Sequence, residues 1–273
     1  MANFLFWNVN KKPVIPLLGA LCHEHSVDVL VLAECPASEV ELLGRLNVDS
    51  EGTFFVPPLP WDGALIKVVS RFPTACMVPF GSLGRANVLR LMPPVGQDVT
   101  LVTVHLPSKM HQDSDDQAGL LSWLADDIAR VEQELQHTRT VVVGDFNMNP
   151  FEVGLISSVG LHAAMTRDIA RAGQRTVQGR ACPFFYNPMW GFFGDTSAGP
   201  PGTYRYDRSG RPVNYCWNIF DQVLVRPALL DSFKSDRVAV LSSAGDVSLL
   251  SRSGRPTPSD HLPIVFQIDL EKE

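Results

Sequence analysis

The hydrophobic residues of this chain fall into short apolar runs that each stop at a polar residue. Runs of four to seven residues rich in Val, Ile and Leu, bounded by turn-forming residues, are typical of core strands. Six such runs occupy positions 4–7, 27–33, 99–104, 140–143, 222–225 and 262–268. A single polar residue at a strand end is usually a solvated edge. Six together indicate a site, because functional groups gather where a rigid sheet presents its ends and loops.

Helical periodicity is present in three places. Residues 114–137 carry apolar residues near the helical period, and Ser114 and Gln117 have the spacing of a capping box. A shorter amphipathic helix is expected over residues 14–25, and another over residues 152–158, just after a proline.

The chain of 273 residues is long enough for one large domain or two small ones. No internal repeat or linker-like tract divides it. Because the polar strand ends extend from Asn8 to His261, one domain must close around all of them. We therefore expect a single domain over residues 1–273.

The charge balance narrows the classes of partner. There are 23 Lys and Arg against 29 Asp and Glu, a formal net charge of −6. A protein that coats nucleic acid or anionic membrane by bulk charge needs an excess of basic residues, so this class is excluded. The balance does not exclude a local basic groove.

The lengths of the apolar stretches and the spacing of the cysteines predict the cellular compartment of the protein. No window approaches the ~18 apolar residues of a membrane span, and Asn8 and Asn10 interrupt the N-terminal stretch where a secretory signal would need to continue. The five cysteines include no CxxC pair, which favours buried, reduced thiols over disulfides or a zinc site. We expect a soluble, cytoplasmic protein with no membrane insertion.

Carboxylates, amides and imidazoles dominate the polar strand ends. Asp145 and Asn147 are two residues apart, as are Asn8 and Asn10, and on an extended segment this spacing places both side chains on one side. Glu34 ends an apolar run, where a buried carboxylate is costly unless it binds a proton, a partner or a cation. Oxygen ligands without a Cys/His cluster suit Mg²⁺ or Mn²⁺. Such an ion with histidines nearby is what hydrolysis of a phosphate ester needs.

Six segments resemble the endonuclease/exonuclease/phosphatase superfamily, which includes exonuclease III-like nucleases and deoxyribonuclease I. They are FWNVN (6–10), VLVLAECP (29–36), VTVHLPS (102–108), VVVGDFNMNP (141–150), FDQVLVRP (220–227) and SDHLPIVF (259–266). They occur in the family's order and extend over nearly the whole chain. GDFN alone is a moderate signal, whereas its combination with SDHLP, an upstream strand Glu and an N-terminal WN is a strong one. The resemblance implies an α/β fold, a four-layer α/β/β/α sandwich of the deoxyribonuclease I-like kind.

The resemblance also implies a role for each matching residue. Asp145 would position or deprotonate the attacking water, with Asn147 orienting the phosphate. His261 would contact the scissile phosphoryl oxygen, Asp221 would orient that histidine, and His105 is a candidate acid for the leaving group. An imidazole beside a carboxylate keeps its proton more readily, which suits these roles. The remaining matches hold a metal: the principal carboxylate Glu34, with Asp260 near the metal and Asn8 helping to hold both metal and phosphate.

Two positions qualify this assignment. Asp260 and His261 are adjacent, so both reach the site only if they lie in the loop before Leu262. Some family members carry an aspartate where this chain has Asn10, which is therefore expected to be structural rather than a ligand. We expect one Mg²⁺ (or Mn²⁺) ion rather than two.

The irregular stretch from about 166 to 216 is rich in Gly, Pro, Arg and aromatic residues, and so long a stretch is usually functional or disordered. Residues 167–211 carry seven Arg against three Asp, a local charge of +4. Interleaved aromatics can stack on unpaired bases while arginines hold phosphates; the alternative is packed loops and solvated arginines. The arginines are Arg167, Arg171, Arg175, Arg180, Arg205, Arg208 and Arg211. The expected substrate-binding residues are Tyr186, Trp190, Tyr204 and Arg205, with Ser108 and Lys109 just after the first histidine.

Together these features predict a divalent-metal-dependent phosphodiester hydrolase, a nuclease that acts on DNA or RNA by in-line attack of water. The segments typical of inositol polyphosphate phosphatases, an Arg shortly after GDxN and a PxWCDR-like sequence, are missing. Two alternatives stay open. One is a phosphomonoesterase or a lipid-headgroup or inositol phosphodiesterase of the same fold, and the other is a non-catalytic binding protein.

Overall fold

Two β-sheets organise the computed structural model, which describes residues 1–48, 52–59, 65–110, 112–197, 199–208, 210 and 212–272. The first sheet has the strand order β15 (Ala239–Val240), β18 (Ile264–Ile268), β1 (Ala2–Asn8), β2 (Val29–Ala33) and β3 (Ile66–Ser70). The second has the order β4 (Met77–Ser82), β5 (Ala86–Leu91), β6 (Val99–His105), β7 (Thr140–Asp145), β14 (Asp221–Val225), β11 (Phe185–Tyr186) and β8 (Ala163–Ala164). All six predicted apolar runs are strands.

The apolar runs form the core between the sheets. Phe4 of β1 and Val141 and Val143 of β7 belong to one buried cluster. Val142 lies on the other face of its sheet, in a second cluster with Leu121 of α3 (Ser114–Leu135). Successive strand residues face opposite sides, so a strand buried on both faces is a continuous apolar run.

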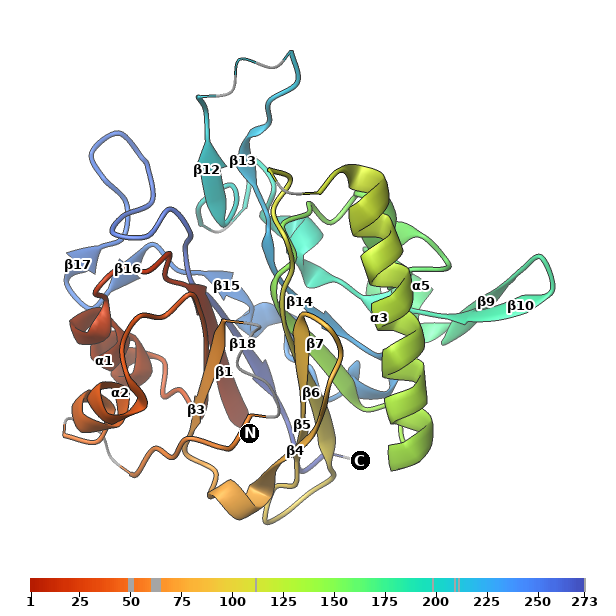
Figure 1. Ribbon diagram of the computed structural model, residues 1–273, viewed down its shortest axis with the longest axis horizontal. Coiled ribbons are helices and arrows are strands. Elements are labelled where there is room, and N and C mark those ends of the chain that lie inside the picture. Colours follow the sequence, from red (N-terminus) through yellow and green to blue (C-terminus); the bar gives the residue numbers. More distant parts are fainter. Residues whose placement is uncertain are drawn as a thin grey trace.

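Helices cover the outer faces of both sheets (Figure 1). α1 (Ile15–Glu24) and α2 (Glu39–Leu46) lie over the first sheet, and α3 lies over the second. This arrangement confirms the predicted four-layer α/β/β/α sandwich. The shorter helical segments are α4 (Val153–Ile156), α5 (Arg167–Arg171) and the 3₁₀ turns Thr74–Cys76, Pro188–Phe192, Pro227–Leu229 and Ser235–Arg237.

The first turn of α3 differs from the sequence expectation. Asp113 is the N-cap, and its side chain accepts hydrogen bonds from two backbone N–H groups of the first turn. The predicted capping box of Ser114 and Gln117 is therefore wrong, because the neighbouring aspartate is an equally good cap. A capping box does open α2, where Ser38 and Glu41 hydrogen-bond reciprocally.

The stretch expected to be irregular contains two hairpins. β9 (Gln174–Val177) pairs with β10 (Arg180–Pro183), and β12 (Tyr204–Tyr206) pairs with β13 (Cys216–Asn218). Figure 1 shows the β9–β10 hairpin projecting beyond the second sheet and the β12–β13 hairpin rising above the strand ends. Their residues are mostly exposed, so no apolar periodicity marks them. Another short hairpin joins β16 (Ser243–Ala244) to β17 (Val247–Ser248). Arg211 lies outside the described residues.

Two sequence expectations concern membranes and thiols. Among the described residues, no helix is long and apolar enough to cross a membrane. All five cysteines are free. Cys22 and Cys182 are buried as expected, but Cys216 is exposed because it lies on the projecting β12–β13 hairpin.

Candidate active site

The register of the sheets places the polar strand ends in one row. In the second sheet His105 pairs with Asp145 across β6 and β7, and Asp145 pairs with Asp221 across β7 and β14. In the first sheet Asn8, the last residue of β1, pairs with Ala33, the last residue of β2. A hydrogen bond from Asn8 to Asp145 joins the two sheets. The site therefore spans the ends of both sheets.

Asp145 is buried and accepts hydrogen bonds at both carboxylate oxygens. Asn8 Nδ2 donates to Oδ2 over 2.9 Å, and the backbone N–H of Asn147 donates to Oδ1 over 2.8 Å. The preceding Gly144 has a φ of +154°, and a Cβ at this position would lie 1.9 Å from the carbonyl oxygen of Val104. Only glycine therefore lets β7 approach β6 so closely just before the aspartate.

His261 is held by contacts to both its ring and its backbone. Its Nδ1 lies 2.9 Å from Asp221 Oδ2, and its Nε2 lies 3.9 Å from Asp145 Oδ2. With Nδ1–H donated to Asp221, Nε2 is the nitrogen left to face the site. Trp7 Nε1 donates to the carbonyl oxygen of His261 over 2.9 Å, and the ring of Tyr204 lies 4.6 Å from the imidazole.

The buried carboxylates favour the protonated imidazole. Burial disfavours the charged form, but the charges of Asp221 and Asp145 outweigh burial and raise the pKa of His261 to about 10. Burial also raises the pKa of Asp221, an effect that the neighbouring His261 opposes. His261 is therefore a cation at neutral pH and can donate a proton from Nε2.

Glu34 lies where β2 ends and the chain turns. It has a φ of +51°, in the left-handed region. Its Oε1 is 3.5 Å from His105 Nε2, and its Oε2 is 3.8 Å from Lys11 Nζ. The hydrogen bond with His105 holds the pKa of the Glu34 carboxyl below its usual range, against the effect of burial. With 20% of its side chain exposed, Glu34 is an ionised carboxylate open to solvent on one side.

The turn after β1 links Glu34 to Asp260. The backbone N–H of Lys11 donates to the Glu34 carbonyl over 3.0 Å, and Asn10 Nδ2 donates to Asp260 Oδ1 over 2.8 Å. Asp260 and His261 both reach the site because they lie in the bend before β18, as the sequence required. Asn10 thus positions a carboxylate.

The oxygen donors around Glu34 fit a hard divalent cation. Glu34 and Asp260 offer carboxylate oxygens, which Mg²⁺ and Mn²⁺ prefer. The Asn8 amide oxygen accepts the backbone N–H of Asn10 over 3.0 Å and keeps a second lone pair for such an ion. A second group, Asp145, Asp221 and His261, also has ligand atoms within 4.8 Å of one another. In this group, however, His261 Nδ1 is hydrogen-bonded to Asp221, and Asp145 accepts two hydrogen bonds. The geometry of this second group therefore suits a protonated His261 better than a bound metal ion.

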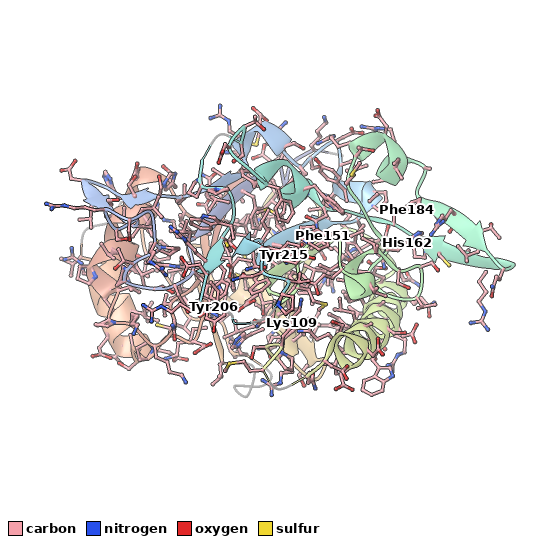
Figure 2. All side chains as sticks on the ribbon, turned by 90° about the horizontal axis from the view of Figure 1, so that it is seen from above. Lys109, Phe151, His162, Phe184, Tyr206 and Tyr215 are labelled. Carbon is pink, nitrogen blue, oxygen red and sulfur yellow. The ribbon has the colours of Figure 1, made fainter. Side chains whose placement is uncertain are left out.

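An aromatic cluster that includes Trp190 surrounds Phe151. The ring of Phe151, four residues after the GDFN segment, lies 6.3 Å from Trp190, 5.7 Å from Phe193 and 5.4 Å from Tyr215. Figure 2, seen from the side of the β12–β13 hairpin, shows Phe151 and Tyr215 close together near the centre of this face. Tyr215 is 58% exposed, so the cluster offers an aromatic surface to a ligand.

The other residues expected to bind substrate have different surroundings. Lys109 forms an ion pair with Glu152, and Ser108 is half-buried beside it. Arg205 Nη1 donates to the carbonyl oxygens of Ser253 and Gly254, 2.8 Å each, so this guanidinium is engaged within the protein.

The prediction for Tyr186 is wrong. Its side chain is 7% exposed, in the core between the sheets, with its ring edge-on to Phe233 and the guanidinium of Arg167 5.9 Å above it. The ring therefore cannot stack on a base. Tyr186 belongs to the short strand β11, which the sequence pattern did not distinguish from the surrounding loops.

Two positioning residues were missed at the sequence level. Ser259 Oγ donates to the Asn8 carbonyl over 2.7 Å and accepts the backbone N–H of His261 over 3.1 Å. Thr203 Oγ1 accepts the backbone N–H of Asp221 over 3.1 Å. Ser259 belongs to the SDHLP segment, which could have marked it, whereas Thr203 lies among Gly and Pro residues that carry no such signal.

A family model decides to which family the chain belongs. The model of the Endonuclease/Exonuclease/phosphatase family matches residues 5–261. The chain belongs to this family. The match begins in β1 and ends at His261, so it includes every strand end that contributes to the site. Among curated proteins, no sequence matches this chain.

Solved structures share the fold of this family member at low sequence identity. The endonuclease domain of TRAS1, a telomere-specific non-LTR retrotransposon, has a TM-score of 0.56 and 15% identity, with 100% of both chains covered. TDP2 from D. rerio, complexed with a single-strand DNA product, has a TM-score of 0.55 and 17% identity, with 97% of both chains covered. The 3′ phosphatase NExo from Neisseria, bound to a product DNA hairpin, has a TM-score of 0.55 and 18% identity over 98% of this chain and 100% of that one. These likenesses confirm the fold.

Proposed function

We propose that this protein is a divalent-metal-dependent phosphodiesterase that hydrolyses nucleic acid by in-line attack of water. The observation that carries the proposal is the buried network in which Asn8, Asp145, Asp221 and His261 meet at the ends of both sheets, with Glu34 beside them. Family membership supports hydrolysis of a phosphate ester. The DNA products named with two structures of the same fold favour a nucleic acid as the substrate.

Glu34, Asn8 and Asp260 would hold the metal. Mg²⁺ or Mn²⁺ supplies positive charge against the phosphoryl oxygens. Asn10 supports this set because its amide holds Asp260 in place. The partial exposure of Glu34 leaves room for a ligand on its open side.

Asp145 accepts the proton of the attacking water. Its two hydrogen bonds, from Asn8 and from the backbone of Asn147, fix the carboxylate before substrate arrives, which lowers the cost of reaching the reactive geometry. His261 donates from Nε2 to the phosphoryl oxygen on which negative charge develops, and Asp221 holds the imidazole in the required orientation.

His105 is the proposed acid for the leaving group, on the side of the site nearest Glu34. A direct contact between Asn147 and the phosphate stays a prediction. In this structure the Asn147 amide nitrogen donates to the Leu106 carbonyl over 2.8 Å, so its visible role is to shape the turn after β7.

A substrate panel tests the proposal. Single-stranded DNA, duplex DNA, RNA, phosphotyrosyl DNA and inositol phosphates are each incubated with Mg²⁺ or with EDTA. The expected result is Mg²⁺-dependent cleavage of an oligonucleotide that disappears in Asp145→Ala. Near-wild-type cleavage by that variant would overturn the mechanism. Release of inorganic phosphate from a 3′-phosphorylated oligonucleotide without internal cleavage would show a phosphomonoesterase instead.

A further inference from the structure

A five-residue sequence, Arg-Ser-Gly-Arg-Pro, occurs twice in this chain, at 208–212 and at 252–256. The first copy follows β12 in the sequence. The second lies in the loop between β17 and β18, closed by an isolated bridge between Leu250 and Pro256. The repeat is too short to define a structural unit and does not divide the fold, but Arg205 and Asp207, just before the first copy, contact the second copy.

Asp207 joins the two loops. Its Oδ2 accepts a hydrogen bond from Arg255 Nη2 over 2.7 Å and lies 3.3 Å from Arg205 Nη2. Arg205 also donates to the carbonyl oxygens of Ser253 and Gly254 in the second loop. The hydrogen bond from Arg255 holds the pKa of Asp207 below its usual range. Asp207 is therefore ionised, and its contacts with the two arginines are ion pairs.

These ion pairs leave more positive than negative charge on the surface of the two loops. Segments 205–208 and 251–256 together contain four arginines and one acid, Asp207. Arg208 and Arg252 are exposed, and 41% of the Arg255 side chain is accessible. We call Arg205, Arg208, Arg252 and Arg255 the cationic rim. It is a dense positive surface on a chain whose net charge is −6.

The cationic rim is continuous with the catalytic residues. β12 starts at Tyr204, whose backbone bridges His261 and whose ring lies 4.6 Å from the imidazole. From Tyr204 to Arg208 the chain spans at most about 14 Å. A nucleic acid strand carries one phosphate about every 3.4 Å along its axis, so the rim would meet phosphates within about four nucleotides of the cleaved bond.

We propose that the cationic rim, whose two loops are held together by Asp207, binds the backbone phosphates of a nucleic acid strand beside the bond that is cleaved. The inference rests on the proposed function and adds the class of substrate: a polynucleotide several residues long rather than a small phosphate ester. Guanidinium groups suit this partner because their planar donors match phosphate oxygens. Tyr206, 47% exposed between Arg205 and Asp207, adds a ring on which a base can stack.

The first test removes the two outermost arginines. In an Asp145→Asn background, which prevents cleavage, Arg208→Ala/Arg252→Ala should weaken binding of a fluorescent oligonucleotide of about a dozen nucleotides several-fold at low salt. The slope of log K against log salt should fall by about 1.4, because about 0.7 is lost for each single-strand phosphate contact. Arg130→Ala/Arg237→Ala removes the same charge at exposed sites on α3 and the Ser235–Arg237 turn, and should bind like the parent.

The second test separates organisation from bulk charge. Asp207→Asn makes the protein more positive but removes the acceptor that joins the loops. Weaker oligonucleotide binding by Asp207→Asn, with an unchanged melting temperature of the fold, is the expected result. Tighter binding would overturn the proposal, because general attraction of charge would then suffice.

Turnover on substrates of two lengths distinguishes failure of the rim from failure of the proposed function. In the active protein, Arg208→Ala/Arg252→Ala should raise KM for the long oligonucleotide several-fold and for a dinucleotide much less. Wild-type cleavage that is insensitive to the pair of substitutions would refute the rim and leave the function intact. Binding that depends on the rim without any cleavage by the wild type would refute the function and leave the rim. Equal loss with the Arg130/Arg237 control would also refute the rim.

Discussion

The floor of the site and the rim above it are built in opposite ways. The floor consists of Asn8, Asp145, Asp221 and His261, each at most 7% exposed and hydrogen-bonded to another member. In the rim, Arg205 and Arg255 share Asp207, whereas Arg208 and Arg252 are exposed to solvent. Buried polar groups are costly to leave unpaired, so the floor has one arrangement, whereas exposed ion pairs contribute little each. The floor is therefore suited to chemistry and the rim to graded selection of substrate.

The largest effect is expected at the floor. Asp145→Asn removes the charge that accepts the proton and should lower kcat by about 10²–10⁴-fold with little change in KM. Asp126→Asn, at an exposed position of α3, is the matched control. Steady-state kinetics on an oligonucleotide measure both. A rise in KM with kcat unchanged would instead place Asp145 with the rim.

Asp221→Asn should reduce kcat by roughly 10²-fold, because the imidazole loses the carboxylate that orients and charges it. The raised pKa of His261 determines how protonation of its imidazole changes with pH. In metal-free wild type His261 stays protonated until pH approaches about 10, and in the variant it should lose its proton at a lower pH. An NMR titration of the imidazole resonances checks this directly. Identical titration curves would contradict the role of Asp221.

Addition of Mg²⁺ tests the role of Glu34, which lies beside the floor. Mg²⁺ at about 100 times its dissociation constant should raise Tm by roughly 5 °C, since a ligand that binds only the native state adds about 2.7 kcal/mol. Glu34→Ala should abolish the increase, and Glu134→Ala on α3 should keep it. A full shift in Glu34→Ala would place the metal elsewhere.

A smaller effect is expected for the aromatic cluster around Phe151. Tyr215→Ala should raise KM for a single-stranded oligonucleotide by about 5-fold or more, because one base stacked on an aromatic ring is worth about 1–3 kcal/mol. Tyr215→Phe keeps the ring and should retain most of the affinity. Tyr186→Phe, in the core, should leave KM unchanged. If Tyr186→Phe changes KM as much as Tyr215→Ala, the distinction between the core and the aromatic cluster around Phe151 is wrong.

The smallest effect is expected away from the site, at His162. Its Nδ1 lies 3.1 Å from the Cys182 carbonyl, its Nε2 accepts from Arg175 Nε over 2.7 Å, and its ring stacks on Phe184, as the labels in Figure 2 locate. Burial first, and then Arg175, lower the pKa of His162. The unfolded chain therefore binds the proton more readily, so this contribution to stability is present above about pH 6.5 and is lost as pH falls. Tm should decrease between pH 7 and pH 5 more in wild type than in His162→Gln, and equal decreases would contradict this account.

The buried strands of the floor could be predicted from the sequence, whereas the exposed hairpins could not. The strands of the floor were predictable because each is a buried run, and their polar ends stood out against it. Ser38 and Glu41 of α2 carried a recognisable cap, yet this helix of 8 residues makes only about two turns and was missed. The hairpins β9–β10 and β12–β13 were missed because exposed strands need no apolar pattern, and Tyr186 was misjudged because a two-residue strand is too short to have one.

By itself the sequence determined which residues end the core strands and in what order, and hence the family and the identity of the floor residues. Local periodicity and motif spacing carry that information along the chain. Only the tertiary structure decided that Asn8 hydrogen-bonds to Asp145 across 137 positions and that Arg205 and Asp207 contact Ser253 and Arg255. Such contacts depend on how two sheets pack and where loops fold back, and no local pattern records distances between segments that are far apart in the chain.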